Sequence, residues 1–496
     1  MRERNTRQLV LTDGPILKTL MKLAAPIMAT AFLSTAYNLT DAFWVGTIGA
    51  EAVAGVGTGG MYLWLSVGFI TLARTGGQVY TAQSIGAGDH ARARGYARAA
   101  VRLALILGLC YGLLCFFAAQ PLLSFFRLSD AKTYAYAYDY LRITGGLVLM
   151  SFLSQVLTGL FTAQGDSRTP FICNVLGLAV NMILDPLLIT GAAFFPRLEA
   201  VGAALATVAA QAIVLTFMLL MVFRNKSESK ILYIGMPQRD NPPRPADACF
   251  PMSGLCSTEP RLQARRSVWS NRAKRNHRPP GQADSLPALP YTLNILRLSF
   301  PHAIQTACYC MFSMVLARMI SAFGSEAIAV QRIGGQIEAL SWNVADGFAA
   351  SLNAFTAQNV GAGKPERYRK GYYYSALTLF CWGSLIALAF FFGAQGIAGL
   401  FFHEESVIII MISYLTIISI CEPFMCVEIL TVGALSALER TKLSGLISIT
   451  LTGARIPLAF FLTSLGLGIP AFWWALTITS VLKGIVFFVT YRVINK

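Results

Sequence analysis

Charge is scarce in this 496-residue sequence. Asp, Glu, Lys and Arg together make up 13% of the residues, and only four residues are histidine. A soluble chain of this length needs more charged side chains to hydrate its surface. Apolar residues make up 55% of the sequence, and the mean hydropathy is +0.57. The scarcity of charge therefore excludes an ordinary soluble globular protein and favours the lipid bilayer as the solvent.

Metal-binding and catalytic motifs are also missing. The ten cysteines are scattered without the spacing of a metal site, so we interpret them as small packing residues. We find no H-E-x-x-H motif and no convincing catalytic triad, and we therefore expect neither enzymatic activity nor a cofactor. The short alternating segments of a membrane β-barrel are absent as well. These absences leave a helical membrane protein as the predicted class.

Long apolar stretches run through most of the chain. A membrane-spanning helix needs about 20 apolar residues, and twelve stretches meet that length. They lie near 16–46, 52–80, 95–118, 134–160, 170–192, 200–223, 292–321, 327–356, 371–393, 408–436, 443–464 and 470–491. Residues 1–14 are charged and lack a small-residue cleavage site, so we expect the first span to be retained. The sequence thus predicts an all-α polytopic protein with twelve transmembrane helices.

The positive charge is distributed unevenly along the chain. The formal net charge is +16, and most Lys and Arg residues fall in segments that twelve spans and an inside N-terminus place in the cytoplasm. This is the positive-inside pattern, which sets the orientation of membrane helices. It predicts cytoplasmic N- and C-termini and membrane lipids as neighbours, and it disfavours nucleic acid as a partner.

The sequence contains an internal repeat. The chain reads "TAQSIGAGDHARARGYA" at 81–97 and "TAQNVGAGKPERYRKGY" at 356–372, 275 residues later. A looser match joins 159–170 to 433–444 at an offset of 274. A nearly constant offset across several spans indicates duplication of a six-helix unit. Because six is even, the two units should be parallel repeats with a cavity between them.

A polar stretch separates the two predicted repeats. Residues 224–290 hold ten of the 21 prolines and a basic run, "QARRSVWSNRAKRNHRPP". This composition predicts a disordered cytoplasmic linker, with lipid contact by the basic run as an alternative. The predicted domains are therefore an N-terminal lobe at 1–223, the linker, and a C-terminal lobe at 291–496.

Ionisable side chains inside a membrane span usually face a cavity or a partner, because they are costly in lipid. Tyr37 and Asn38 precede Asp41 by four and three residues in the first span, which places the three on one helix face. We expect Tyr37 and Asn38 to line a cavity beside the Asp41 carboxylate.

The fifth predicted span carries a matching polar stripe. Asn174, Asn181 and Asp185 follow one another at steps of seven and four residues, and Asn174 is expected to line the cavity. Asp41 and Asp185 should lie at a similar depth in the outer half of the membrane. Two carboxylates with an amide suit a proton or a hard cation, with Na⁺ at Asp41, Asn181 and Asp185 as one option. A hydrogen bond that only joins two helices is the alternative interpretation.

The second half does not repeat this polar site. The corresponding positions hold Leu316, Arg455 and Ala459. Other charged side chains are present there instead: Arg318, Arg332, Glu338, Asp346, Glu422 and Glu428. We expect some of these to pair between helices 7, 8, 10 and 11 and others to line a cavity wall. Cation coupling is therefore expected mainly in the first half.

Prolines stand at the same place in the first span of each half. Pro26 and Pro301 are 275 residues apart, and Pro26 lies about four turns below Asp41. Proline removes a backbone donor and bends a helix. Titration of the site could change the bend at Pro26, although a static bend would leave the same sequence pattern.

Several of these stretches together resemble one transporter family. "LAAPIMATAFLSTAYNLTDAFWVGTIGAEAVAGVG", the paired "GAG" loops, "GLFTAQGDSRTPF" and "NMILDP" are similar to the multidrug and toxic compound extrusion (MATE) family, closest to its DinF-like prokaryotic branch. The resemblance covers residues 14–223 and 291–496. It implies twelve helices in two lobes around a central cavity. It also implies antiport of H⁺ or Na⁺ against organic, often cationic, compounds across a prokaryotic cytoplasmic membrane, by a monomer.

The resemblance also assigns roles to individual residues. The family's acid in helix 1 falls on Asp41, and its bending proline falls on Pro26. The amide and acid of helix 5 fall on Asn181 and Asp185. Thr207, within "ALAT" on helix 6, is implied as a further member of the cation site.

A flippase for a lipid-linked sugar or another amphiphile is the alternative function. Such proteins share a related architecture, but they commonly have fourteen helices and a basic cavity. The number of spans and the positions of Arg318 and Arg455 would therefore discriminate between the two functions.

Overall fold

The described part of the chain is helical throughout, apart from short turns. The computed structural model describes residues 9–126, 130–191, 196–224, 289–402 and 404–495. The first half forms α1 (Ile16–Gly46), α2 (Ala50–Gly86), α3 (His90–Phe117), α4 (Ala119–Ser124), α5 (Ala131–Tyr140), the π-helical turn η1 (Leu141–Gly145), α6 (Leu149–Ala163), α7 (Arg168–Thr190) and α8 (Glu199–Arg224). The predicted linker at 224–290, with its cysteines, lies almost entirely outside the described residues.

The second half follows the same order of helices. It forms α10 (Leu289–Ser321), α11 (Ser325–Gly361), α12 (Pro365–Phe401), α13 (Glu405–Ser419), α14 (Glu422–Ala437), α15 (Thr441–Gly453), α16 (Arg455–Ser464) and α17 (Pro470–Ile494). By length and composition, nine spans of the described chain suit a membrane crossing, and two bent helix pairs bring the number to eleven. The helix α11, at 37 residues, is as long as α2 but is not among these spans.

Two of the predicted spans are bent rather than straight. The span predicted at 134–160 bends by 48° between η1 and α6, and the span predicted at 408–436 bends by 54° between α13 and α14. Pro423 stands in the first turn of α14, where its ring and missing N–H prevent α13 from continuing. Periodicity of apolar residues cannot reveal such bends, because both halves of each span remain apolar.

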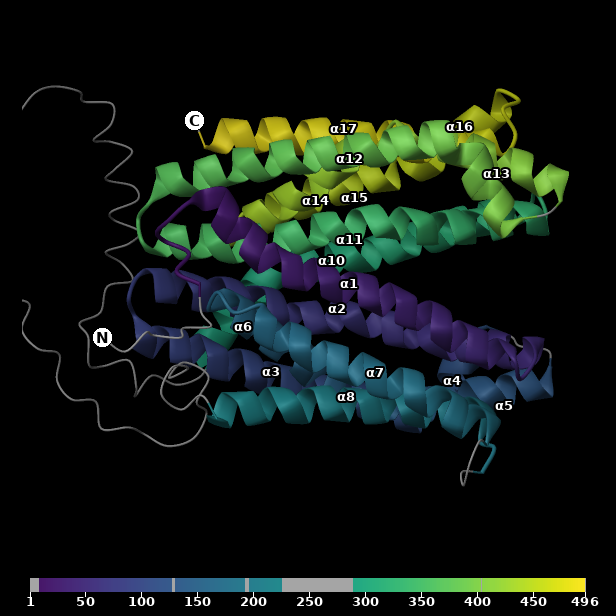
Figure 1. The fold of residues 1–496 in the computed structure, drawn as a ribbon, viewed down its shortest axis with the longest axis horizontal. Helices are drawn as coiled ribbons and strands as arrows, with labels where there is room; N and C mark the ends of the chain where they lie inside the picture. The colour runs from purple at the N-terminus through teal and green to yellow at the C-terminus, as the bar shows by residue number, and fades with distance from the viewer. Residues whose placement is uncertain (1–8, 127–129, 192–195, 225–288, 403, 496) are drawn as a thin grey trace, which may run out of the picture.

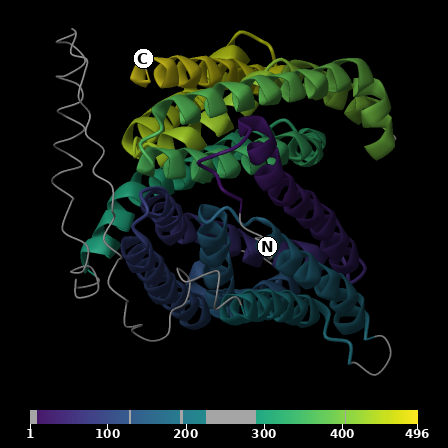
Figure 2. The same ribbon diagram turned by 60° about the vertical axis from the view of Figure 1, so that its left-hand side comes forward.

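The helices form two layers with α1 between them. In Figure 1 the helices α11–α17 lie above α2–α8, and α1 runs obliquely along the boundary, whereas the start of α10 packs in the buried cluster of the first half through Ile295. The turned view in Figure 2 keeps the two groups apart. Leu20 and Leu23 of α1 belong to the same buried cluster as Phe348 and Phe355 of α11, so α1 packs on the opposite half. A Cβ at Gly347 of α11 would lie 2.5 Å from Cγ of Met28, which shows how close this crossing is.

Equivalent residues of the two repeats meet where α2 and α11 cross. Gln78 donates from Nε2 to Oδ1 of Asn353 at 3.2 Å, and these two positions are 275 residues apart. A contact between equivalent residues requires that they lie beside the pseudo-two-fold axis that relates the repeats. The axis therefore passes between α2 and α11.

The duplicated segments themselves touch one turn further along. A Cβ at Gly86 would lie 1.9 Å from the carbonyl oxygen of Gln358, and a Cβ at Gly361 would lie 1.9 Å from that of Gln83. We call this pairing of residues 82–86 with 357–361 the repeat contact. Only glycine allows two helix backbones to approach so closely. The repetition in the sequence thus preserves two surfaces that pack against each other.

Two reciprocal hydrogen bonds flank the repeat contact. Gln83 donates to the carbonyl oxygen of Ala437 at 3.1 Å, and Gln358 donates to that of Ala163 at 2.7 Å. Four equivalent alanines pack together beside them: Ala82, Ala163, Ala357 and Ala437. Each half therefore contributes the same donor, the same acceptor position and the same small side chains, so the contact is symmetric.

Residues 9–14, which we call the terminal strap, join the two halves at the same end. The amide of Leu9 donates to the carbonyl oxygen of Gly165 in the first half at 3.2 Å. Arg367 of α12 donates to the carbonyl oxygens of Asp13 and Gly14 at 2.7 and 2.8 Å. Lys364 forms an ion pair of 2.9 Å with the carboxylate of Asp13. The strap therefore spans from the turn after α6 to the start of α12.

Candidate functional site

A polar cavity of about 430 Å³ lies in the first half, among α1, α2, α6, α7 and α8. All three residues that the sequence predicts as cavity lining border it, namely Tyr37, Asn38 and Asn174. Asn181 and Thr207 border it as well. The amide of Asn174 donates to the carbonyl oxygen of Pro170 at 2.8 Å, which fixes this side chain along its own helix.

The two predicted carboxylates lie beside this cavity. Asp41 and Asp185 each stand five residues before the end of their helix, at Gly46 and Thr190, so they share one depth. The two carboxylates interact electrostatically. Asp185 is 0% exposed and Asn181 is 1% exposed. The structure thus brings the predicted acids and amide of two helices together.

These buried polar atoms lack protein partners. Both carboxylate oxygens of Asp185, both amide atoms of Asn181 and Oδ1 of Asp41 have no hydrogen-bond partner among the described residues. A buried carboxylate without a partner is unfavourable unless it is neutralised. A bound proton or a cation held by oxygen atoms would neutralise it, and oxygen is the ligand that hard cations prefer.

Tyr140 is a member of this site that the sequence does not reveal. It stands at the junction of α5 and η1, is 7% exposed, and lies against Thr207 together with Tyr37. The hydroxyl of Thr207 donates to the carbonyl oxygen of Ala203 at 2.9 Å. Tyr140 ends the tyrosine-rich stretch "YAYAYDY" at 134–140. The sequence alone does not indicate which of these tyrosines faces the site, because that depends on the π-helical turn η1 that follows.

Pro26 lies inside α1, which continues unbroken through it from Ile16 to Gly46. The hydroxyl of Thr30 donates to the carbonyl oxygen of Pro26 at 3.0 Å. Met28, two residues after Pro26 along α1, packs closely against Gly347 of α11. Any change in the direction of α1 at Pro26 would therefore alter a contact between the two halves.

Two of the buried acids of the second half, Glu428 and Glu338, have partners within the protein. Lys483 of α17 forms an ion pair of 2.7 Å with Glu428 of α14, and both side chains are nearly buried. The hydroxyl of Tyr414 donates to the carboxylate of Glu338. The sequence predicted pairing of Glu428 but named no partner on helix 12. Lys483 lies inside the apolar stretch 470–491, and a charged residue in such a stretch could have indicated a buried partner.

Arg455 is anchored in a similar way. Its Nε donates to Oγ1 of Thr479 at 2.9 Å, and its Nη2 donates to the hydroxyl of Ser480 at 2.8 Å. Asp346 of α11 interacts electrostatically with Arg74 of α2 in the other half. The second half thus carries its positive charges as side chains, at the depth where the first half has only acids and amides.

The described part of the chain contains no set of ligands for a zinc or iron site. No group of three or more His, Cys, Asp or Glu side chains there could hold a metal ion. A site of two carboxylates and one amide, as at Asp41, Asn181 and Asp185, is instead of the kind that binds a proton or Na⁺ through oxygen.

A known family model matches the chain twice. The MatE model matches residues 26–187 and 301–461, so the matched segments begin 275 residues apart, as the internal repeat does. A probable multidrug resistance protein, NorM of Thermotoga maritima, is 26% identical over 90% of this chain and 85% of its own length. An FAD transporter of Shewanella oneidensis is 25% identical over 96% of this chain and 94% of its own length.

Solved structures share the fold. A MOP superfamily transporter from Pyrococcus furiosus superimposes with a TM-score of 0.82 at 21% identity, and the match covers 99% of both chains. A multidrug resistance MATE family transporter in an outward-facing conformation gives a TM-score of 0.81 at 20% identity, again over 99% of both chains. The two six-helix lobes and the duplicated helix order are therefore those of the MATE fold. The chain belongs to the MatE family of multi-pass membrane transporters, and is a transporter rather than an enzyme.

Proposed function

We propose that this protein is an antiporter that exports organic, often cationic, compounds by alternating access and draws its energy from H⁺ or Na⁺. We assign it to the DinF-like branch and place it, as a monomer, in the cytoplasmic membrane of a prokaryote with both termini in the cytoplasm. The buried, unpartnered carboxylates of Asp41 and Asp185 beside the 430 Å³ cavity carry the proposal.

The coupling follows from the electrostatics of the site. A cation or proton that enters from outside binds at Asp41, Asn181 and Asp185, with Thr207 and Tyr140 beside it, and removes the cost of the buried negative charge. The cation must bind the outward- and inward-facing states with different affinities, because otherwise binding shifts no equilibrium. Its arrival then favours a conformation from which the organic compound has left the cavity.

The repeat contact and the terminal strap fit the closed end of such a cycle. Both lie at the end where residues 9–14 meet α12, which the positive-inside pattern assigns to the cytoplasm. The alternative, a flippase for a lipid-linked sugar, has less support. The second-half cavity contains acidic as well as basic side chains, and the family's named relatives include multidrug resistance proteins.

The test is efflux of ethidium from proteoliposomes that contain the purified protein, with H⁺ and Na⁺ gradients imposed separately. Wild type should move ethidium under at least one gradient, and that gradient identifies the ion. Asp41→Asn should abolish the gradient dependence, whereas Asp139→Asn, at an exposed position of α5, should retain it. Persistence of gradient-driven efflux in Asp41→Asn, or wild-type movement that ignores both gradients, would overturn the proposal.

A further inference from the structure

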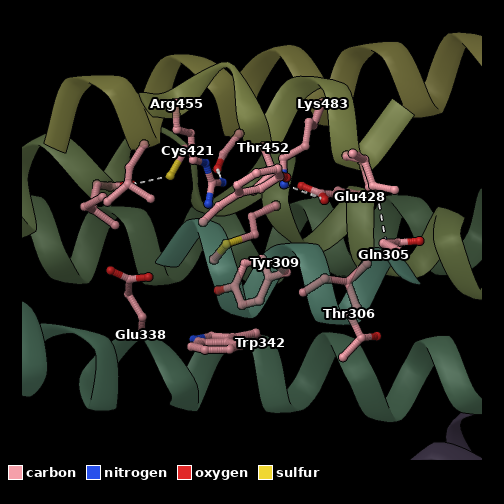
Figure 3. A pocket seen from close by; sticks show the side chains of 18 of the residues that line it. Gln305, Thr306, Tyr309, Glu338, Trp342, Cys421, Glu428, Thr452, Arg455 and Lys483 are labelled. Atoms are coloured by element: carbon pink, nitrogen blue, oxygen red, sulfur yellow. Dashed lines mark hydrogen bonds and ion pairs between the residues drawn. The ribbon is translucent and has the colours of Figure 1, made fainter. Parts of the chain in front are cut away.

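A second polar cavity, of about 260 Å³, lies in the second half among α10, α11, α13, α14, α15, α16 and α17. Figure 3 shows its interior, with Arg455 and Lys483 pointing into it from one side and Glu338 and Trp342 from the other. Its volume is below the range of about 300–1,000 Å³ that is typical of drug-sized ligands. A ligand of this cavity should therefore be small, with one ring system.

The basic side of the cavity is formed by Arg455. Its side chain is 7% exposed, and two hydroxyl groups hold the guanidinium in place through Nε and Nη2. No carboxylate of the described residues forms an ion pair with it. Lys483 differs, because its charge is compensated by Glu428 at 2.7 Å. Arg455 therefore keeps an unmatched positive charge and the remaining donors of Nη1.

The acidic side is formed by Glu338, which lines the cavity, whereas Glu422 lies near that carboxylate without lining the cavity itself. Tyr414 donates to the carboxylate of Glu338 and fixes its position. Glu422 is 0% exposed, and neither of its carboxylate oxygens has a hydrogen-bond partner in the described chain. The two carboxylates interact electrostatically. The carboxylate of Glu338 therefore faces the cavity with no cation paired to it among the described residues.

The two sides attract each other but do not meet. Glu338 and Arg455 interact electrostatically, yet no ion pair forms between them within the described residues. Each is held by its own partners, Tyr414 on one side and the hydroxyls of Thr479 and Ser480 on the other. Opposite charges kept apart in a buried space gain little of their mutual attraction and still lose hydration. A ligand that carries both charges would compensate both.

Aromatic side chains lie between the two charged sides. Figure 3 places the ring of Tyr309 above that of Trp342 and below Arg455, with Glu338 to one side. The indole Nε1 of Trp342 is buried without a hydrogen-bond partner among the described residues, as is Oε1 of Gln305 at the far side of the cavity. Aromatic rings offer a flat ligand a large contact area, and their faces also attract cations.

We propose that this cavity binds a small aromatic zwitterion, with its carboxylate on Arg455, its ammonium group at Glu338, and its ring against Tyr309 and Trp342. Arginine presents paired donors that match a carboxylate, and such charge-assisted hydrogen bonds are strong. That the bound compound is also a transported substrate rests on the proposed antiport function, whereas the binding itself does not.

The test is binding to the purified full-length protein by isothermal titration calorimetry, with three compounds that share one ring. L-Tryptophan carries both charges, tryptamine lacks the carboxylate, and indole-3-propionate lacks the ammonium group. Wild type should bind tryptophan at least tenfold more tightly than either of the other two. Equal affinities for the three compounds, or no binding of tryptophan, would overturn the inference.

Variants separate the two charged sides. Arg455→Gln should bind tryptophan no better than tryptamine, and Glu338→Gln should bind it no better than indole-3-propionate. Because each comparison is made within one variant, a partial loss of folded protein does not change its outcome. Asp139→Asn should keep the wild-type preference. An Arg455→Gln protein that still prefers tryptophan tenfold over tryptamine would show that the charges of this cavity serve only the packing of the helices.

This test and the efflux test fail independently. Loss of ion-driven ethidium efflux in every preparation, with tryptophan preference intact, would remove the antiport function and leave the binding site. Ion-driven efflux without tryptophan binding would do the reverse.

Discussion

The two halves of the protein are nearly identical where they touch and different where they carry charge. At the repeat contact, Gly86 packs against Gln358 in the same way that Gly361 packs against Gln83. A Cβ at either glycine would lie 1.9 Å from the carbonyl oxygen of the glutamine that it faces. At the depth of the cation site, the position of Asn181 in the first half is taken by Arg455 in the second. The duplication has thus kept the contact between the halves and changed the electrostatics within each.

The difference at that depth has a direct physical meaning. In the first half the carboxylates of Asp41 and Asp185 have no ion pair among the described residues, so a proton or cation from solution can compensate them and can be exchanged. The second half supplies its own positive charges, Arg455 and Lys483, which cannot leave. A mobile charge responds to ion gradients, whereas a covalently attached one contributes to packing or to recognition. This contrast supports the proposal that coupling belongs to the first half.

The largest effect on stability is expected from breaking the buried ion pair between Lys483 and Glu428. Glu428→Gln leaves the ammonium group of Lys483 buried without a counter-charge, and loss of one partner of a buried pair costs about 3–5 kcal/mol. Asp185→Asn, in contrast, removes a buried charge that has no protein partner and should leave the free energy of unfolding unchanged or raise it. Denaturant-induced unfolding in detergent measures both.

A matched double substitution controls for packing. Glu428→Gln combined with Lys483→Met removes both charges and should recover most of the lost stability, because no unpaired charge remains. Equal destabilisation by Asp185→Asn and Glu428→Gln would show that the acids of the two halves have equivalent protein partners, contrary to the structure.

The next largest effect is expected at the repeat contact. Gly86→Ala and Gly361→Ala each place a Cβ 1.9 Å from a backbone carbonyl oxygen, so the helices must separate. Overpacking of this kind costs about 1–3 kcal/mol. Because the contact is symmetric, the two substitutions should lower the melting temperature by similar amounts and should favour a conformation in which this end is open.

Two other glycines of the same helices provide the controls. Gly60 and Gly335 are also 275 residues apart, and a Cβ at either meets no atom of the described residues within 4 Å. Alanine at these positions should be neutral or stabilise the helix by up to about 1 kcal/mol. Melting temperatures that fall equally at all four positions would indicate a general effect of the substitution and not a close helix crossing.

The smallest effect is expected at the terminal strap. The ion pair with Lys364 lowers the pKa of Asp13 below its usual value of 3.8. A carboxyl group whose pKa is lower in the folded state stabilises the protein above its unfolded pKa and loses this effect as the pH falls through the folded value. Both side chains are largely exposed, so salt and water weaken the pair.

Asp13→Asn should therefore lower the melting temperature only slightly at pH 7 and low salt. The difference from wild type should shrink as the pH is lowered below about 4 or as salt is added. A large difference that persists in high salt would mean that the strap is held mainly by the Asp13 carboxylate and not by the backbone carbonyls that Arg367 contacts.

The sequence predicts the spans well and marks the residues of the candidate first-half site, for identifiable reasons. Long apolar stretches mark the helices directly, so the span predicted at 16–46 coincides with α1. Asp41 and Asp185 stand out because charge is rare in an apolar helix. Their convergence follows from their similar depth, which the structure confirms by placing each five residues from a helix end.

Other features depend on contacts that one sequence does not encode locally. Tyr140 reaches the site because of the turn η1. Lys483 of α17 pairs with Glu428 of α14, which is 55 residues earlier in the sequence. The bond between Gln78 and Asn353 was implicit in the repeat, because only residues near a two-fold axis can meet their own copies. Without knowledge of where the axis lies, many other pairs at the same offset would have qualified.

The most direct test of the account compares two buried acids, one in each half, in the same assay. Ion-gradient-driven efflux of ethidium from proteoliposomes is measured for Asp185→Asn and Glu422→Gln, with reconstituted protein amounts matched. If coupling belongs to the first half, Asp185→Asn abolishes the gradient dependence and Glu422→Gln retains it. Retained dependence in Asp185→Asn together with its loss in Glu422→Gln would place the coupling ion in the second half and contradict the account.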